Sequence, residues 1–111
     1  MESIEKEVGK RKLILKWHNI GDGLLVTLTG GDEHIGAVAV GNSGASSVIS
    51  LPGHRDDEIA HRQAGRINRK TGNDTVFLVG IHFNNIQPDE ISKICDTAEL
   101  MVDELIDILE E

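Results

Sequence analysis

Residues 88–109 read PDEISKICDTAELMVDELIDIL, and this stretch carries the clearest structural pattern in the chain. Its apolar residues recur every three or four positions, which predicts an amphipathic α-helix of about five turns. Pro88 suits the first helical position, and Asp89 and Glu90 complement the positive end of the helix dipole. Cys95 lies on the apolar stripe, so we expect it to be a small core residue. The stripe consists of Ile91, Ile94, Cys95, Ala98, Met101, Val102, Leu105, Ile108 and Leu109.

The same segment holds the charge imbalance of the protein. The 111 residues include 19 acidic and 11 basic side chains, which gives a formal net charge of −8. Nine acidic residues and one lysine, Lys93, lie between Asp89 and Glu111, so this segment accounts for the whole −8. Residues 1–88 are therefore electrically balanced, and such a neutral body can accept an anionic phosphate ligand.

Two further elements precede the acidic helix. Residues 75–83 are apolar at nearly every position, which is typical of an interior strand covered on both faces. A shorter helix is predicted over residues 56–70, because acidic residues open it and basic residues close it. Gly72 is placed to cap the end of this helix.

The first half of the chain has the pattern of strands and turns. Glycine-containing turns separate four predicted strands, at residues 11–19, 24–29, 35–40 and 47–51. The element order is then β-β-β-β-α-β-α. We predict one α+β domain over residues 11–111, with a largely antiparallel sheet and two helices, preceded by a flexible N-terminus at residues 1–10.

Composition excludes several classes of function. An acidic chain with only three aromatic residues lacks the basic surface and the stacking platforms of a nucleic-acid-binding protein. No apolar run approaches the roughly 20 residues that span a bilayer, so we expect no membrane partner. The N-terminal MESIEKEVGKRK is charged where a signal peptide is apolar, and the single cysteine suits a reducing compartment. We therefore expect a cytoplasmic protein.

Three histidines are expected to meet at one edge of the sheet. If the four predicted strands form an antiparallel meander, the third strand begins where the fourth ends. A crossover helix then returns the fifth strand parallel to the fourth, so that it ends at the same edge. His34, His54 and His82 occupy these strand ends. Three neutral imidazoles suit zinc or another first-row divalent metal.

Neighbouring residues bear on this metal hypothesis. Asp32, Glu33 or Asp57 could add a ligand or orient one. The alternative is that each histidine is an isolated polar residue at a strand end. The two other histidines, His18 and His61, are expected to be structural or exposed.

Other chemistry is sparse. The loop from Gly41 to Ser47 contains no GxGxxG or GxxxxGK, which favours a hairpin turn over a phosphate cradle. Ser46 and Ser47, together with Arg55, are the candidates to hold a phosphate group of a cofactor. No GxSxG motif, paired cysteine nucleophile or pair of isolated carboxylates indicates catalysis, so a binding protein is favoured over an enzyme.

Three stretches resemble one known family. They are HIGAVAV at residues 34–40, ASSVISLPGHRDDEIA at 45–60 and GIHFNN at 80–85. They resemble the LpdD-like proteins, the small D subunits that accompany hydroxyarylic acid decarboxylases of the UbiD type, over residues 11–109. This resemblance implies a non-catalytic chaperone that carries prenylated FMN for a decarboxylase of the UbiD type with the help of a divalent metal ion. It also implies His34, His54 and His82 as the metal ligands.

A second resemblance concerns the fold. The element order, with SVISLPG before the shorter helix and RINRKTGNDTVFLVG spanning its end and the following strand, is similar to the small proteasome assembly chaperones. That likeness implies a protein-assembly chaperone without metal or flavin. A third alternative is an accessory subunit of a decarboxylase complex. A homodimer is expected in the first case, where the flavin could lie at a subunit interface.

Overall fold

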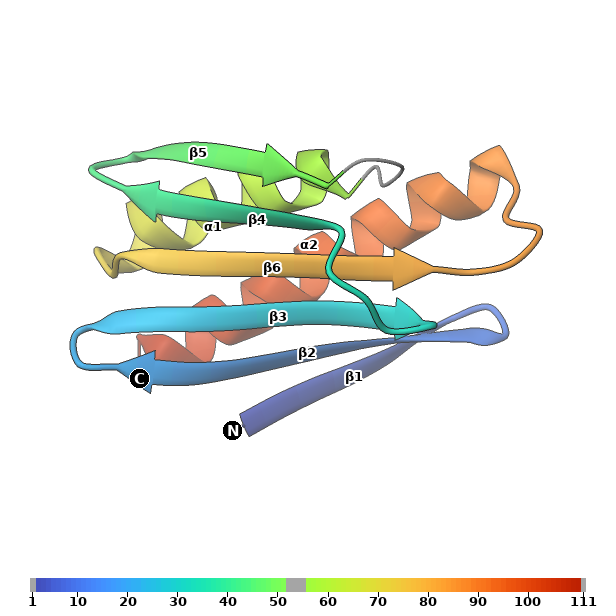
Figure 1. The fold of residues 1–111 in the computed structure, drawn as a ribbon. Coiled ribbons are helices and arrows are strands. Elements are labelled where there is room, and N and C mark those ends of the chain that lie inside the picture. The colour runs from blue at the N-terminus through green and yellow to red at the C-terminus, as the bar shows by residue number, and fades with distance from the viewer. Residues whose placement is uncertain (1, 52–55, 111) are drawn as a thin grey trace.

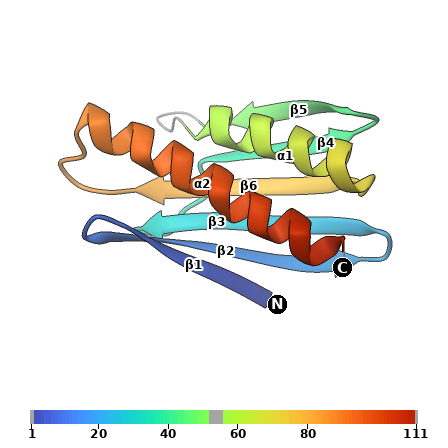
Figure 2. The same cartoon turned by 180° about the vertical axis from the view of Figure 1, so that it is seen from behind.

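A six-stranded sheet with two helices on one face makes up the computed structural model, which describes residues 2–51 and 56–110. Figure 1 shows the sheet in front of both helices, and Figure 2 shows the helices from their own side. The elements are β1 (Glu2–Val8), β2 (Arg11–Ile20), β3 (Gly23–Gly31), β4 (Ala37–Asn42), β5 (Ala45–Ser50), α1 (Asp57–Thr71), β6 (Thr75–His82) and α2 (Pro88–Leu109). The predicted fold class, an α+β domain with a largely antiparallel sheet and two helices, is confirmed.

The order of the strands differs from the predicted meander. The sheet runs β1-β2-β3-β6-β4-β5, so β6 is inserted between β3 and β4. It pairs parallel with β3 and antiparallel with β4. Burial explains the insertion, because the most continuously apolar strand gains most from a central place with both edges paired. The predicted strand directions are nevertheless correct, since β6 runs parallel to β3 and β5.

The N-terminus is also different from the expectation of a flexible segment at residues 1–10. Residues 2–8 form β1, which pairs antiparallel with β2. Ile4 and Val8 of this strand pack against the core, and Nζ of Lys6 lies 2.5 Å from a carboxylate oxygen of Glu104 on α2. The alternation that predicts a strand was masked by the four charged residues of MESIEKEV.

The core lies between the sheet and the two helices. From the sheet it takes fully buried side chains such as Leu15, Leu28 and Phe77. Small residues of α1 allow that helix to lie close to β4, whereas α2 crosses β6, β3 and β2 diagonally (Figure 2). Met101 and Leu105 of α2 are fully buried in the core. Within the described residues, no helix combines the length and the apolar character that crossing a membrane requires.

Salt bridges link the helices, and a glycine cap ends α1. Arg62 of α1 donates a hydrogen bond of 2.6 Å to Glu99 of α2, and Arg66 pairs with Asp103 of α2. Gly72 ends α1 in the left-handed conformation, at φ +79°, as the sequence predicts.

The close approach of α1 to β4 depends on Gly41. A Cβ atom at this position would lie 2.3 Å from the backbone oxygen of Ala64 in α1. We therefore expect Gly41→Ala to lower the free energy of unfolding by about 1–3 kcal/mol, the usual cost of overpacking. Urea denaturation measures this change. Ser47→Ala on the neighbouring β5, an exposed position, is the control and should change it by less than about 0.5 kcal/mol; equal effects of the two substitutions would contradict the account.

Candidate functional site

The carboxyl end of β6 brings two histidines together. His82 ends β6 opposite Gly31 of β3, and His34 lies in the segment that leads into β4. Their rings pack edge to face with centroids 6.3 Å apart. The predicted convergence of His34 and His82 at one sheet edge is thus observed, while their role as metal ligands stays a prediction. His54 and Arg55 lie outside the described residues.

Asp56 links these histidines to the end of α1. Its side chain is largely buried, and its Oδ2 accepts a hydrogen bond of 3.4 Å from the backbone N–H of Ile81. Strand β4 begins opposite Val79, so the carboxylate takes the place of a strand partner for the end of β6. The same oxygen lies 3.6 Å from Nε2 of His34.

Two further features define the corner formed by the two histidines and Asp56: close packing at Gly36 and a second contact of His34. A Cβ atom on Gly36 would lie 2.0 Å from Oδ2 of Asp56, so only glycine leaves room for the carboxylate there. Nδ1 of His34 lies 3.0 Å from the carbonyl oxygen of Asp32, an acceptor, which places a proton on Nδ1. The other ring nitrogen, Nε2, is the one that faces Oδ2 of Asp56. Asp57 is one of the carboxylates that the sequence suggests near the histidines, whereas in the structure Asp56 occupies that place.

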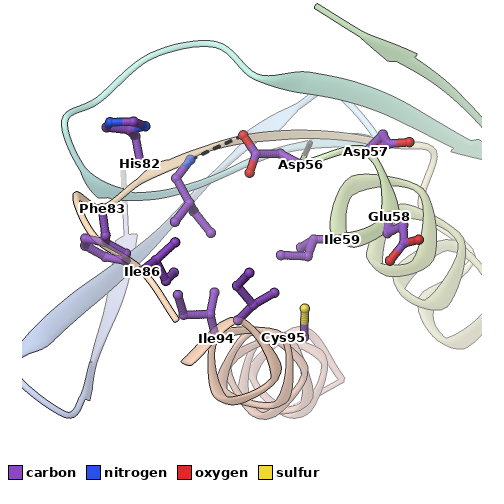
Figure 3. A pocket seen from close by; sticks show the side chains of 11 residues that line it. Asp56, Asp57, Glu58, Ile59, His82, Phe83, Ile86, Ile94 and Cys95 are labelled. Atoms are coloured by element: carbon purple, nitrogen blue, oxygen red, sulfur yellow. Dashed lines mark hydrogen bonds between the residues drawn. The ribbon is translucent and has the colours of Figure 1, made fainter. Parts of the chain in front are cut away.

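A cavity of about 630 Å³ adjoins this corner, between the first turns of α1 and α2 and the end of β6. Figure 3 shows Ile59, Ile86 and Ile94 turned toward it, and it shows His82 on the other side of the β6 ribbon from Ile94. The apolar part of the wall consists of Ile59, Ile81, Phe83, Ile86, Ile91 and Ile94. The volume falls within the range of roughly 300–1,000 Å³ that is usual for small-molecule sites.

One wall of the cavity is acidic. Asp56, Asp57 and Glu58 line it where α1 begins, and among the described residues neither lysine nor arginine lines it. The N-terminus of a helix attracts anions, but three carboxylates oppose that attraction. An anionic ligand in this cavity needs a cation close by to offset the repulsion.

Cys95 corrects one expectation. It lies on the apolar stripe of α2, yet it is exposed and lines the cavity instead of packing in the core. Partial burial raises the pKa of its thiol, and the carboxylates of Glu58 and Asp96 raise it further. The apolar stripe of α2 is thus wider than the part of it that packs in the core. In the first turns of α2, residues of the stripe such as Ile91 line the cavity instead.

The structure places Ser46 and Ser47, two of the predicted phosphate ligands, away from the cavity. The hydroxyl of Ser46 lies 2.5 Å from Nδ1 of His61 and donates to the carbonyl oxygen of that residue at 2.8 Å. Ser47 is exposed and pairs with Val40, on the half of β5 remote from its histidine end. Neither serine lines the cavity. The cavity residues were missed in the sequence because Phe83, Ile86 and Ile91 look like ordinary apolar residues flanking a loop.

The described residues contain no complete metal site. Across residues 2–51 and 56–110, no three His, Cys, Asp or Glu side chains are grouped so that they could hold a metal ion.

Comparison with known proteins gives the family. Residues 7–110 match the prenylated flavin chaperone LpdD-like domain, so the chain belongs to this family. A family of chaperones agrees with the expectation of a non-catalytic protein. No curated protein sequence matches the chain.

The fold also occurs in solved structures. One of them is the crystal structure of a novel chaperone complex for yeast 20S proteasome assembly, a chain of which aligns with a TM-score of 0.57 and 11% identity. The alignment covers 98% of this chain and 94% of that one. The predicted likeness to proteasome assembly chaperones is therefore confirmed at the level of the fold.

Asp56 should matter for stability through its contact with the end of β6. Asp56→Ala leaves the Ile81 N–H without its acceptor, and we expect a loss of about 1–3 kcal/mol in the free energy of unfolding. Asp56→Asn keeps an acceptor oxygen and should lose less. Chemical denaturation of both variants tests this order; a larger loss for Asn than for Ala would contradict the role given to the carboxylate.

The raised pKa of Cys95 predicts that its thiol reacts slowly with thiol reagents. The thiolate is the reactive form, and at pH 7–8 a raised pKa leaves less of it than in a free cysteine. We expect Ellman's reagent to react more slowly with the protein than with a cysteine peptide, and the rate to rise with pH. Glu58→Gln should speed the reaction by removing a nearby negative charge, whereas Asp107→Asn, more than three turns further along α2, should leave it unchanged. A rate at or above that of the peptide would contradict the pKa direction.

Proposed function

We propose that this protein binds prenylated FMN transiently and delivers it to a decarboxylase of the UbiD type, with the ring system of the flavin in the cavity between α1 and α2. The observation that carries the proposal is the position of this apolar cavity beside the His34–His82 pair. Membership of the prenylated flavin chaperone family supports the choice of ligand. The protein has a carrier's role and performs no chemical step itself.

The walls of the cavity suit a flat, largely apolar ring system. Isoleucines from both helices line it, and Phe83 is the aromatic side chain available for stacking. Phe83 is itself held by Arg11, whose guanidinium carbon lies 5.1 Å from the centroid of the ring. Arg11 also lies 3.3 Å from a carboxylate oxygen of Glu90 on α2, which ties this wall to the helix.

A divalent metal ion is the second part of the proposal. We assign its ligands to His34, His54 and His82, of which His34 and His82 are near one another and His54 stands two positions before Asp56 in the sequence. Nε2 of His34 and Oδ2 of Asp56 face each other at 3.6 Å, and an imidazole nitrogen and a carboxylate oxygen both suit a first-row divalent metal. Such an ion would supply the positive charge that an anionic flavin needs beside the acidic wall, and an open coordination position for an electron-rich ligand.

The phosphate group of the flavin needs its own partner. Arg55 is the residue that we propose for it, since it adjoins the start of α1 in the sequence and brings a guanidinium group that can bind phosphate in a bidentate manner. Ser46 and Ser47 stay predictions as phosphate ligands, and the fact that neither lines the cavity supports the arginine. The decarboxylase as the recipient, the homodimer and the cytoplasmic location also stay predictions.

A protein-assembly role is the alternative that one observation favours. The fold is shared with a chain of a proteasome assembly chaperone complex, and among the described residues one face of the sheet carries no helix (Figure 1). A chaperone of this kind would capture its client proteins equally well without His34 and His82. An accessory subunit of a decarboxylase complex would instead co-purify with the decarboxylase irrespective of flavin.

Flavin binding and its dependence on metal can be measured together. Prenylated FMN is titrated into protein that has been freed of metal and into protein supplied with Mn²⁺ or Zn²⁺, and binding is followed by flavin absorbance and by protection of Cys95 from a thiol reagent. We expect binding and protection only with metal. His34→Ala, His54→Ala and His82→Ala should each weaken the binding of flavin by about 10–100-fold or more, the usual cost of disturbing a metal site.

His18→Ala is the matched control for the histidine variants. His18 pairs with Leu25 near the start of β3, at the opposite end of the sheet from His82, and is exposed. Its removal should leave flavin binding unchanged. Tight binding of flavin in the absence of metal would contradict the proposed role of the metal ion. The absence of flavin binding under all conditions would contradict the proposed carrier function.

A further inference from the structure

In the part of the chain that the structure describes, one face of the sheet carries no helix, and along β3, β6, β4 and β5 this face is largely apolar. Its residues alternate with those of the core along β3, β6, β4 and β5, and pairing in the sheet aligns them in two rows. One row contains Leu78, Val38 and Ile49, and the other contains Leu25, Val76 and Val40. We call these six residues the open-face patch.

The patch is unusual for a chain that stands alone. Ile49 is 71% exposed and Val40 is 45% exposed, and both are large apolar side chains. Contiguous apolar patches of this kind on a soluble protein mark sites of interaction. At about 4.8 Å between strands and 3.3 Å per residue, the face of all six strands, with β1 and β2 included, measures on the order of 600 Å² in flat projection, against the ~800 Å² per partner of a typical stable interface. The open-face patch is the apolar centre of that area, and β1 and β2 form its polar rim.

We propose that a second copy of this chain covers the open-face patch, with the two sheets packed face to face around a twofold axis. Strands β3, β4, β5 and β6 contain no Asp, Glu, Lys or Arg, so this pairing would bury no charge of the four strands that carry the patch. The charged residues of this face lie on β1 and β2 and include Glu5 and Lys12, whose charged groups lie 3.5 Å apart. Because the β1–β2 edge carries both acidic and basic residues, it can lie against the same edge of a second copy without net repulsion.

The distribution of charge selects this face over the helical one. Residues 89–111 carry the whole net charge of −8, and α2 lies on the other side of the sheet (Figure 2). Two copies that met through their helices would bring these acidic segments together, at a cost in repulsion. Two copies that meet through their sheets place them on opposite outer surfaces, in the layer order helix, sheet, sheet, helix.

The proposal gives a surface to the homodimer of the proposed function, and it depends on neither flavin nor metal. Its test therefore uses the full chain without either, in sedimentation equilibrium and light scattering over a range of concentrations. We expect a mass twice the 12.1 kDa of the chain. Ile49→Asp and Val40→Asp should each raise the dissociation constant of the dimer by about 100-fold or more, because each buries two unpaired carboxylates at a symmetric interface.

Leu100→Asp is the matched control on α2. Leu100 is 58% exposed, so the substitution places the same charge at a comparable site on the helical side, and the dimer should persist. Far-UV circular dichroism verifies that each variant is folded, and since Ile49 is exposed in the single chain its substitution leaves the core intact. The wild type gives an independent readout, because the melting temperature of a dimer rises with protein concentration.

Two results would overturn the proposal. A wild type that is monomeric at all concentrations would leave the open-face patch to a different protein, such as the decarboxylase. A dimer that survives Ile49→Asp and Val40→Asp but dissociates with Leu100→Asp would place the interface on the helices. Either result would leave the binding of flavin and metal to be judged by its own titration.

Discussion

The insertion of β6 between β3 and β4 is the constraint on which the site depends. Because β6 is paired on both edges and its Phe77 and Val79 are buried, its carboxyl end is fixed relative to both halves of the sheet. His82 and the start of the cavity wall follow directly at that end. Strand β4 begins opposite Val79, three residues before that end, which leaves the backbone N–H of Ile81 to be bound by Asp56 and draws the start of α1 to the same point.

Because both helices lie on one face of the sheet, the two sides of the molecule differ in polarity and charge (Figure 1). The helical side holds the core, the cavity and the acidic surface of α2, whereas the opposite side is largely apolar along β3, β6, β4 and β5 and carries its charged residues on β1 and β2. Binding of a small molecule and association with another protein can therefore occupy different faces of one small domain. The two faces meet at the end of β6, where His82 lies beyond the strand from the cavity's isoleucines (Figure 3).

Local patterns in the sequence predict most helices and strands, but they do not predict which strands pair with one another in the sheet. The spacing of apolar residues in 88–109 and the acidic start and glycine end of α1 depend on residues close in sequence, and both helices form as expected. The place of β6 depends on competition among strands for a central position, which no local pattern contains. The edge strand β1 escaped notice because its charged side chains hide the alternation of Ile4, Lys6 and Val8. Of the site, the His34–His82 pair follows from strand direction alone, whereas Asp56 and the cavity depend on the packing of three elements.

The central claim is that the apolar cavity and the histidine pair act as one site for prenylated FMN and a metal ion. Coupled binding is reciprocal, so each ligand must strengthen the binding of the other by the same factor. The most direct measurement is the metal and flavin content of the protein after gel filtration from solutions that contain either ligand or both. The account predicts that metal and flavin are retained together, in equal amounts per chain, and that each is largely lost when applied alone. Retention of each ligand irrespective of the other would contradict it.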